Sequence, residues 1–437
     1  MKTVQDAPNG AIIVHPFTRL SQRSHDPEAA LSEAIGLSCA LNLVVCDALC
    51  LNVKKVIPAT FIGGGAIENL AERLGKYNAK ILVFDGQLTP VQQRNLEERL
   101  QVKVLDRTGL ILEIFSLRAK TKEGRLQVEL ARIAYERSRL VRTWTHLERQ
   151  RGGKGFLAGP GERQIESDRR ELADEAIVLG RRLDKIKRTR SLHRKARIKR
   201  HVPMVALVGY TNAGKSTLFN RLTDADVLVK DMLFATLDPT IRDVQLPGRT
   251  KAVLSDTVGF ISNLPTELIA AFRATLEEVT QADLVLHVRD IACLQSEKQK
   301  HDVEEVLKQL HPANGKMPTM VEVWNKMDLL TEENQNFLRE RAAKLSVPPI
   351  LISAETGEGT QNLLERVASI LHGDQQTIII TLPAKDSSAL NWLHQHGRIV
   401  RCDAAKNQDL ECEVTLDVAA MGRFQAQFPE LMAGIAS

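Results

Sequence analysis

One stretch of the sequence combines glycine, lysine and serine at a spacing that suits phosphate binding. It reads Gly209-Tyr-Thr-Asn-Ala-Gly-Lys-Ser216, between an apolar run at 205–208 and a helical pattern at 217–222. Glycines let successive backbone N–H groups turn toward a phosphate, and the start of a helix favours negative charge. We therefore expect Lys215 to contact the β- and γ-phosphates of a nucleotide and Ser216 to ligate Mg²⁺.

A second motif, Leu-Ser-Asp-Thr-Val-Gly at 254–259, carries groups that suit the γ-phosphate end of such a site. The Asp256 carboxylate can hold the Mg²⁺ shell, and the Gly259 N–H can bond the γ-phosphate. Two upstream threonines, Thr236 and Thr240, compete for the role of Mg²⁺ ligand in the triphosphate state. We favour Thr236, because Thr240 also fits a turn after the preceding proline.

A third motif, Asn-Lys-Met-Asp at 325–328, is expected to recognise the base. The Asp328 carboxylate can accept the N1 and N2 hydrogens of guanine, which adenine lacks at those positions. Asn325 is expected to reach the opposite edge of the base, and the Lys326 stem to cover it. A fourth motif, Ser353-Ala354, can supply a backbone N–H to the guanine oxygen. Together, the four motifs in this order predict a guanine-nucleotide-dependent GTPase.

The four motifs and the first switch define the expected contacts of the nucleotide. The expected GTP contacts are Gly209, Tyr210, Thr211, Asn212, Ala213, Gly214, Lys215, Ser216, Phe234, Ala235, Thr236, Leu237, Asp238, Asp256, Thr257, Val258, Gly259, Asn325, Lys326, Met327, Asp328, Ser353, Ala354 and Glu355. Ser216 and Thr236 are the expected metal ligands.

Two positions bear on catalysis. Many GTPases orient the attacking water with a glutamine just after the glycine of the second switch, and here Phe260 holds that place. An apolar ring cannot orient water, so we expect slow unaided turnover, with Lys215 as the main catalytic side chain. Asn212 has two open interpretations. It could bind a K⁺ ion beside the phosphates, or it could serve a tight turn.

These motifs need a scaffold, and 437 residues suggest about three domains at roughly 150 residues each. We expect an α/β protein: a P-loop GTPase domain with an N-terminal α/β domain, a long antiparallel helical pair and a small C-terminal α+β domain. The expected bounds are 1–120 for the N-terminal domain, 121–200 for the helical pair, 201–373 for the GTPase domain and 374–437 for the last domain. The alternation of β-branched and helical segments supports the first and third.

The helical pair is expected from apolar residues that recur every three or four positions, with a glycine-rich loop at 151–161 as its tip. The second helix ends in 181–200, which holds eleven Lys or Arg residues against one acid, Asp184. Such a run is usually a solvated helix face. Its almost uniformly positive charge beside a glycine-rich loop also leaves contact with RNA phosphates open.

The remaining composition describes an ordinary globular chain, with 43% hydrophobic and 26% charged residues and a net charge of +5. The six cysteines include no Cys-x-x-Cys pair and are expected to be buried thiols in a reducing compartment. We expect a cytoplasmic protein, because the N-terminus lacks a signal peptide and the most apolar window, 34–53, contains polar residues. We also expect it to be monomeric. Peripheral membrane attachment stays open.

The combined motifs resemble those of the HflX GTPases, a translation-factor-related family with a hydrophobic residue in place of the catalytic glutamine. The likeness covers nearly the whole chain. Outside the GTPase motifs it rests on 106–112 (DRTGLIL), 123–129 (EGRLQVE), 159–162 (GPGE) and 168–170 (DRR). The chain departs from the family pattern in the loop at 152–163, which has an extra residue, and in Arg163, which replaces a threonine.

This resemblance implies a GTPase that binds the large ribosomal subunit and its rRNA, where hydrolysis is stimulated, and it supports Thr236 as the Mg²⁺ ligand. Together with the charge of 181–200, it favours RNA contact over a solvated helix face for that run. Splitting or rescue of stressed ribosomes is one role it leaves open. A nucleotide-gated RNA- or ribosome-binding module is an alternative. Another is an ATP-dependent RNA remodeller that uses Phe61-Ile-Gly-Gly-Gly65 in the N-terminal domain, although a plain tight turn fits that segment better.

Overall fold

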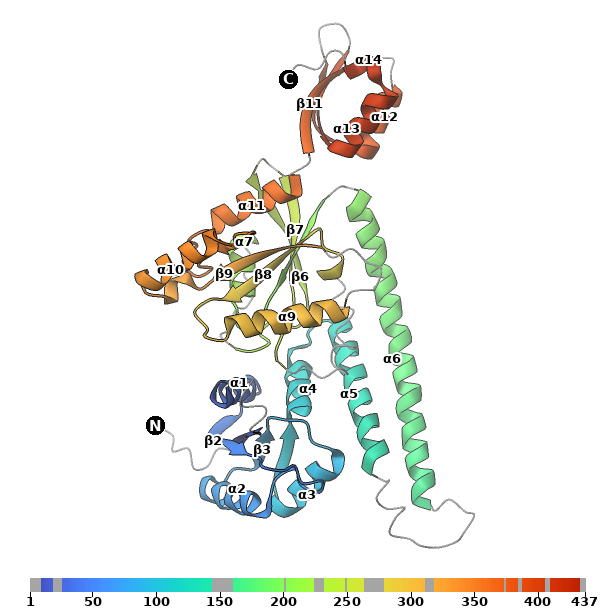
Figure 1. Ribbon diagram of the computed structural model, residues 1–437. Coiled ribbons are helices and arrows are strands. Elements are labelled where there is room, and N and C mark those ends of the chain that lie inside the picture. The colour runs from blue at the N-terminus through green and yellow to red at the C-terminus, as the bar shows by residue number, and fades with distance from the viewer. Residues whose placement is uncertain are drawn as a thin grey trace.

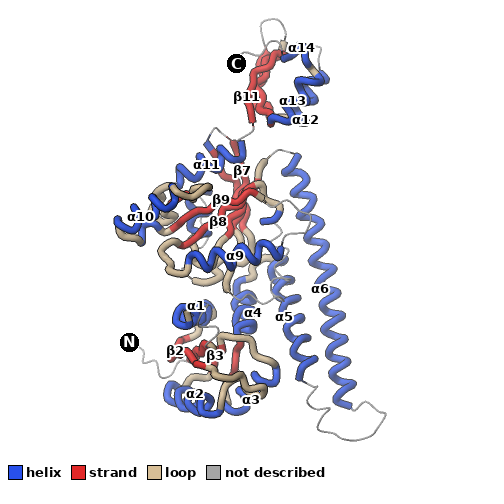
Figure 2. The backbone as a smooth tube through the Cα atoms, in the orientation of Figure 1, coloured by secondary structure: helices blue, strands red, loops and turns tan. Residues whose placement is uncertain are grey.

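The computed structural model describes most of the chain and shows three β-sheets and a helical pair (Figures 1 and 2). The described residues are 9–18, 26–143, 160–199, 202–223, 232–247, 250–262, 279–310, 318–372, 375–383, 387–404 and 409–432.

The N-terminal sheet is parallel throughout, with the strand order β2-β1-β3-β4. Its strands are β1 (Gly10–Phe17), β2 (Val44–Asn52), β3 (Ile81–Phe84) and β4 (Lys103–Asp106), and its helices are α1 (Pro27–Ala40), α2 (Gly64–Tyr77), α3 (Pro90–Leu100) and α4 (Arg107–Arg118). Local sequence explains several helix starts: Asp26 caps α1, and Thr89 forms a capping box with Gln92 at α3. The run 107–118 has apolar residues on every side and gave no helical period, so helix α4 was not expected from the sequence.

Helices α5 (Lys122–Thr143) and α6 (Pro160–Lys199) form the helical pair, which lies alongside the N-terminal sheet and the central six-stranded sheet (Figure 1). Leu126 and Ile133 of α5 pack with Leu179 of α6, as the apolar spacing predicts. Helix α5 is also fixed to the N-terminal sheet, because the Tyr135 hydroxyl donates to Asp106 at 2.8 Å. The expected tip loop lies mostly outside the described residues. Its last positions, from Pro160 onward, are helical, since proline is tolerated in the first turn of a helix.

The central sheet has the order β10-β9-β8-β5-β7-β6, and all its strand pairs are parallel except the edge pair β6–β7. Its strands are β5 (Met204–Val208), β6 (Thr240–Leu246), β7 (Thr250–Asp256), β8 (Leu284–Asp290), β9 (Thr319–Asn325) and β10 (Ile350–Leu351), and its helices are α7 (Lys215–Thr223), α9 (Ser296–Leu310), α10 (Glu332–Ala343) and α11 (Thr360–His372). The edge strand β6 was not expected. Because Thr240 begins this strand opposite Asp256, it is not a turn residue.

The C-terminal sheet is antiparallel, with the order β11-β13-β12, and helices cover one of its faces (Figure 1). Its elements are β11 (Gln375–Leu382), α12 (Ser387–His396), β12 (Arg398–Ala404), β13 (Leu410–Asp417), α13 (Val418–Gln427) and α14 (Pro429–Met432). Cys402 and Cys412 face each other on neighbouring strands and form a disulfide. The expectation of six buried thiols is therefore wrong: two cysteines are paired, and Cys39 is exposed.

One hydrophobic core joins the N-terminal and central sheets. It contains Leu110 and Phe115 of α4 together with Phe234, Val258 and Phe260 of the GTPase motifs. The Phe115 and Phe234 rings meet edge to face, with centroids 4.8 Å apart. The two halves are thus packed against each other through the segments that surround the expected nucleotide site. Among the described residues, no helix is both long and apolar enough to cross a membrane.

Candidate nucleotide-binding site

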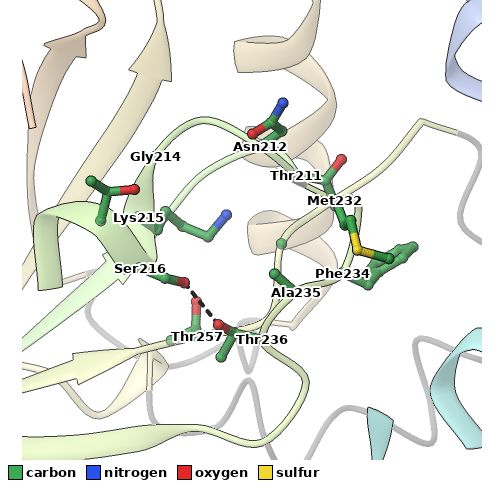
Figure 3. A pocket seen from close by; sticks show the side chains of 12 residues that line it. Thr211, Asn212, Gly214, Lys215, Ser216, Met232, Phe234, Ala235, Thr236 and Thr257 are labelled. Carbon is green, nitrogen blue, oxygen red and sulfur yellow. Dashed lines mark hydrogen bonds between the residues drawn. The ribbon is translucent and has the colours of Figure 1, made fainter. Parts of the chain in front are cut away.

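The phosphate-binding loop follows the buried strand β5 and ends in helix α7, as its flanking patterns predict. It borders a cavity that is also lined by Phe234, Ala235 and Thr236 of the first switch and by Thr257 and Gly259 of the second (Figure 3). The Lys215 Nζ lies inside the loop and donates to the carbonyls of Gly209, at 3.1 Å, and Tyr210, at 2.7 Å. The loop thus presents a buried ammonium group where a phosphate would sit.

Three oxygen-bearing side chains converge on the metal end of this cavity. Ser216 Oγ donates to Asp256 Oδ2 at 2.7 Å and lies 2.8 Å from Thr236 Oγ1 (Figure 3). Asp256 is fully buried, and its Oδ1 has no hydrogen-bond partner among the described residues. An unpaired buried carboxylate oxygen beside two hydroxyls fits a hard cation such as Mg²⁺.

The buried charges have shifted pKa values. Burial lowers the pKa of Lys215 to about 8, although Asp256 opposes the shift. Burial also raises the pKa of Asp256, against the opposing effects of Lys215 and its hydrogen bonds to Ser216 and Thr236. Both shifts express the cost of holding isolated charges in a closed site. Bound phosphates and a cation would each compensate one of these charges.

The second switch approaches the phosphate loop so closely that only glycine fits at 259. A Cβ there would lie 2.8 Å from Thr211 Cγ2 and 3.2 Å from Lys215 Nζ. Backbone bonds hold the approach: Thr211 N donates to the Phe260 carbonyl at 2.7 Å, and Phe260 N donates to the Gly209 carbonyl at 3.1 Å. The Phe260 side chain is only 3% exposed and lies in the shared core rather than in the cavity lining.

The base-recognition motif has a structural role that the sequence did not indicate. Asn325 Nδ2 donates to the Ala213 carbonyl at 2.9 Å, and Asn325 Oδ1 accepts from the Ala354 N–H at 2.9 Å. One side chain therefore fastens the phosphate loop to the Ser353–Ala354 loop. Gly214, with φ +89°, makes room for it, because a Cβ at Gly214 would lie 2.2 Å from Asn325 Nδ2.

Lys326, Met327 and Asp328, which come directly after Asn325 in the chain, complete the base-recognition motif. Lys326 has a positive φ of 68° and an ion pair with Asp290 at 2.8 Å, which holds its stem in place. Met327 is buried and Asp328 lies beside it in the 3₁₀ turn Met327–Leu329. Arg221 of α7 was not anticipated: its Nε donates to the Ala354 carbonyl at 2.8 Å, and its guanidinium also contacts the Glu355 carbonyl. No local motif marks such a residue.

Several of the expected nucleotide contacts point elsewhere. Phe234 and Leu237 are buried in or beside the shared core, and the Asp238 carboxylate binds the backbone N–H groups of Lys120 and Thr121, at 2.8 and 2.7 Å. Thr257 Oγ1 donates to the Leu207 carbonyl at 2.6 Å. Leu237 and Asp238 thus shape the first switch from outside the cavity, whereas Phe234 and Thr257 line the cavity although they are also held by the core or the backbone.

A buried polar network connects the phosphate loop to the N-terminal sheet. The Tyr210 hydroxyl contacts Glu33 of α1 and lies 2.9 Å from Ser262 Oγ. Arg107 of α4 pairs with Glu33 and Asp85, and its Nη2 donates to the Ser262 carbonyl at 2.8 Å. The second switch is thus held by groups from both halves of the molecule. Sequence reasoning missed this network because its members lie far apart along the chain.

Two further expectations concern the basic run on α6 and the glycine-rich turn before α2. In the basic run, Arg181, Arg182 and Lys185 of α6 are exposed. The glycine-rich turn of the N-terminal domain leads into α2 at Gly64, without a side-chain cap. A plain turn accounts for this geometry.

Sequence comparisons relate three consecutive segments to known families. Residues 28–116 match the N-terminal region of a GTP-binding GTPase, residues 118–197 match its middle region, and residues 204–326 match a family described as 50S ribosome-binding GTPase.

Individual relatives match over almost the full chain. "GTPase HflX" of Magnetococcus marinus is 44% identical over 98% of this chain and 97% of that protein. "GTPase HflX" of Escherichia coli is 39% identical over 98% of each. Among solved structures, a GTP-binding protein from Sulfolobus solfataricus in complex with GDP aligns with 83% of this chain and 99% of that one, at 23% identity and a TM-score of 0.42.

Proposed function

Because this chain belongs to the HflX family of GTPases, we propose that it hydrolyses GTP in a Mg²⁺-dependent reaction that the large ribosomal subunit stimulates. The supporting observation is that the buried Lys215 and the oxygen cluster around Asp256 lie beside a second switch whose Phe260 side chain is buried away from the cavity. A site that binds GTP but lacks a water-orienting side chain at this position needs a partner for rapid turnover.

Each motif has a defined part in this reaction. Lys215 and the Gly259 N–H neutralise charge on the γ-phosphate, and Asp328 selects guanine. Ser216 and Thr236 would hold Mg²⁺, with Asp256 beside them, and the cation would supply charge neutralisation between the β- and γ-phosphates. Asn325 positions the phosphate loop against the base-recognition loop.

We place the contact with ribosomal RNA on helix α6. Arg181, Arg182 and Lys185 are exposed there, within a run that contains a single acid. Arginine and lysine side chains bind phosphates, and each such contact makes binding weaken with salt. We propose accordingly that the protein acts in the cytoplasm, where ribosomes function.

GTP hydrolysis titrated with purified large subunits tests the proposal. We expect turnover to rise by at least about tenfold at saturation, since a partner that completes a GTPase site gives large effects. A rate that stays constant across the titration would favour a nucleotide-gated binding module instead.

The RNA contact has its own test. The triple change of Arg181, Arg182 and Lys185 to Gln should reduce the slope of log affinity against log salt by about 2–3. Lys54, Lys55 and Lys103, which are exposed in the N-terminal domain, form the matched control when changed to Gln. Equal slopes for the triple variant, its control and the unchanged protein would refute the contact on α6.

A further inference from the structure

The Asp238 carboxylate of the first switch binds the start of helix α5, a contact that joins residues more than 100 positions apart. Its Oδ2 accepts from the N–H groups of Lys120 and Thr121 at 2.8 and 2.7 Å, and its Oδ1 accepts from Thr121 Oγ1 at 2.6 Å. Asp238 lies two residues after Thr236, the expected Mg²⁺ ligand. The switch and the helical pair are therefore in direct contact.

Thr121 links this carboxylate to the helix itself. It caps α5, because its Oγ1 accepts from the Gly124 N–H at 2.9 Å while the same hydroxyl donates to Asp238. A carboxylate at a helix N-terminus is also favoured by the helix dipole. Asp238 thus completes the N-terminal cap of a helix that belongs to a different part of the fold.

Gly124 allows this close approach. A Cβ at this position would lie 2.1 Å from Asp238 Oδ1 and 3.1 Å from Asp238 Cγ, so the carboxylate would have to move away from the helix start. Glycine costs stability in a helix relative to alanine. At this position, it provides the space that the switch carboxylate occupies.

The rest of the first switch is held from the same side. Phe234 packs edge to face on Phe115 of α4, and Leu233 approaches Gly36 of α1. Between these contacts and Asp238 lies Thr236, whose hydroxyl is 2.8 Å from Ser216 Oγ. The segment is therefore fixed on both sides of Thr236 in a position that suits the bound triphosphate.

We propose that Asp238 is a positioning residue that holds the first switch closed from the start of α5 and so favours GTP over GDP. Its carboxylate binds the start of α5 and does not line the cavity. It acts by keeping Thr236 at the metal end of the cavity, so its removal should weaken only the binding that needs a closed switch. This inference goes beyond the proposed function and does not depend on binding to the ribosome.

Affinities for GDP and for a non-hydrolysable GTP analogue, measured on full-length Asp238→Ala and Asp238→Asn, test this role. Loss of a helix cap is expected to lower affinity for the analogue by about 3- to 30-fold, with a smaller loss for Asn, which keeps one acceptor. GDP affinity should stay within about twofold, because GDP binding does not require the closed switch. Asp243→Asn, an exposed position on β6, is the control.

Two outcomes would overturn the proposal: an equal loss for both nucleotides, which indicates a general structural role, or no loss for either. A double-mutant cycle then tests the contact itself. Gly124→Ala should lower affinity for the analogue in the unchanged protein but have little further effect in Asp238→Ala, where the carboxylate is gone. A similar effect of Gly124→Ala in both backgrounds contradicts the assignment.

A measurement on the unchanged protein covers the case in which these variants do not fold. The amides of Lys120 and Thr121 should exchange hydrogen more slowly with the GTP analogue bound than with GDP bound, because the closed switch keeps Asp238 on them. Equal exchange in the two nucleotide states argues against the proposal.

Discussion

The Tyr210 hydroxyl accepts a hydrogen bond from the Ser262 backbone N–H at 2.8 Å, so the phosphate-binding loop holds the second switch through a side chain. Burial, reinforced by Glu33, raises the pKa of Tyr210 well above its ordinary value, and the phenol therefore stays protonated. Ser262 Oγ in turn donates to Asp302 of α9 at 2.7 Å. The Tyr210 hydroxyl therefore connects the phosphate-binding loop with the second switch and with the N-terminal half of the molecule.

Tyr210→Phe removes this hydroxyl and leaves the Ser262 N–H without its hydrogen-bond acceptor. We expect the free energy of unfolding to fall by about 1–3 kcal/mol and the Ser262 amide to exchange hydrogen faster. Thermal unfolding and hydrogen exchange measure the two effects. Tyr77→Phe in α2 is the matched control. An unchanged exchange rate at Ser262 would show that the hydroxyl does not hold the switch.

Phe260→Gln restores the residue type that many GTPases carry, yet we expect it not to speed hydrolysis. The side chain lies in the shared core, so the amide would be buried without a partner, at a cost of about 2–4 kcal/mol. Phe337→Gln, at an exposed site on α10, should change stability by less than about 0.5 kcal/mol. Single-turnover hydrolysis and thermal unfolding check this pair. A large gain in rate would mean that residue 260 reaches the nucleotide.

GDP affinity should decrease as pH rises through about 8, the lowered pKa of Lys215. Bound phosphates favour the charged lysine and raise its pKa, so binding above that pH requires proton uptake, and the loss approaches about tenfold per pH unit. Titration calorimetry from one unit below to one unit above this pKa, in buffers of different ionisation enthalpy, measures the uptake. Affinity that stays constant over that range contradicts this role of Lys215.

In the absence of nucleotide, the lowered pKa of Lys215 makes folding stability rise with pH, whereas it makes nucleotide affinity fall with pH. A lysine pKa below its unfolded value means that the unfolded chain binds more protons between about 8 and 10.5, so folding stability should increase as pH rises through that range.

Asp328→Asn and Asn325→Ala should separate base recognition from loop fastening. Xanthine has a carbonyl where guanine has its amino group, so Asp328→Asn should lower GTP affinity by about 10- to 100-fold and raise affinity for xanthosine triphosphate. Asn325→Ala removes the bonds to Ala213 and Ala354 and should weaken both nucleotides alike. Competition binding with the two triphosphates makes the comparison. An unchanged preference in Asp328→Asn would exclude it from base recognition.

Asn212→Gly distinguishes the two interpretations of Asn212. This residue is exposed and has a φ of +60°, a conformation that glycine also adopts easily, so the substitution removes the amide and keeps the turn. If the amide helps to bind K⁺, GTP turnover should be faster in K⁺ than in Na⁺ for the unchanged protein, and the difference should disappear in the variant. Equal rates in both salts count against the ion.

The phosphate loop, the first switch threonine and the base-recognition motif could be located from the sequence because each has a short pattern whose geometry is local. Lys215 and Ser216 follow a strand and begin a helix, which fixes their direction. Thr236 came from its place before the second switch. That Phe260 stands where many GTPases have a glutamine came from its place directly after Gly259, and the family resemblance agrees with it.

The remaining features depend on contacts between distant segments. The sequence assigned Asp238 to the nucleotide, but its direction is decided by α5, which packs beside the switch. Asn325 was expected to face only the base, whereas its amide bonds to the Ala213 carbonyl on one side and to the Ala354 N–H on the other. Strand β6 and helix α4 were missed because neither shows a clean apolar period.

The length of α6 has a mechanical consequence. Its 40 residues span about 60 Å at 1.5 Å per residue, and in Figure 1 its Pro160 end lies far from the central sheet while its Lys199 end lies beside it. A rotation of roughly a tenth of a radian about the Lys199 end would carry the Pro160 end through about 6 Å, more than one helical turn. A small tilt at the Lys199 end of α6 is thus amplified into a displacement of several ångströms at its Pro160 end.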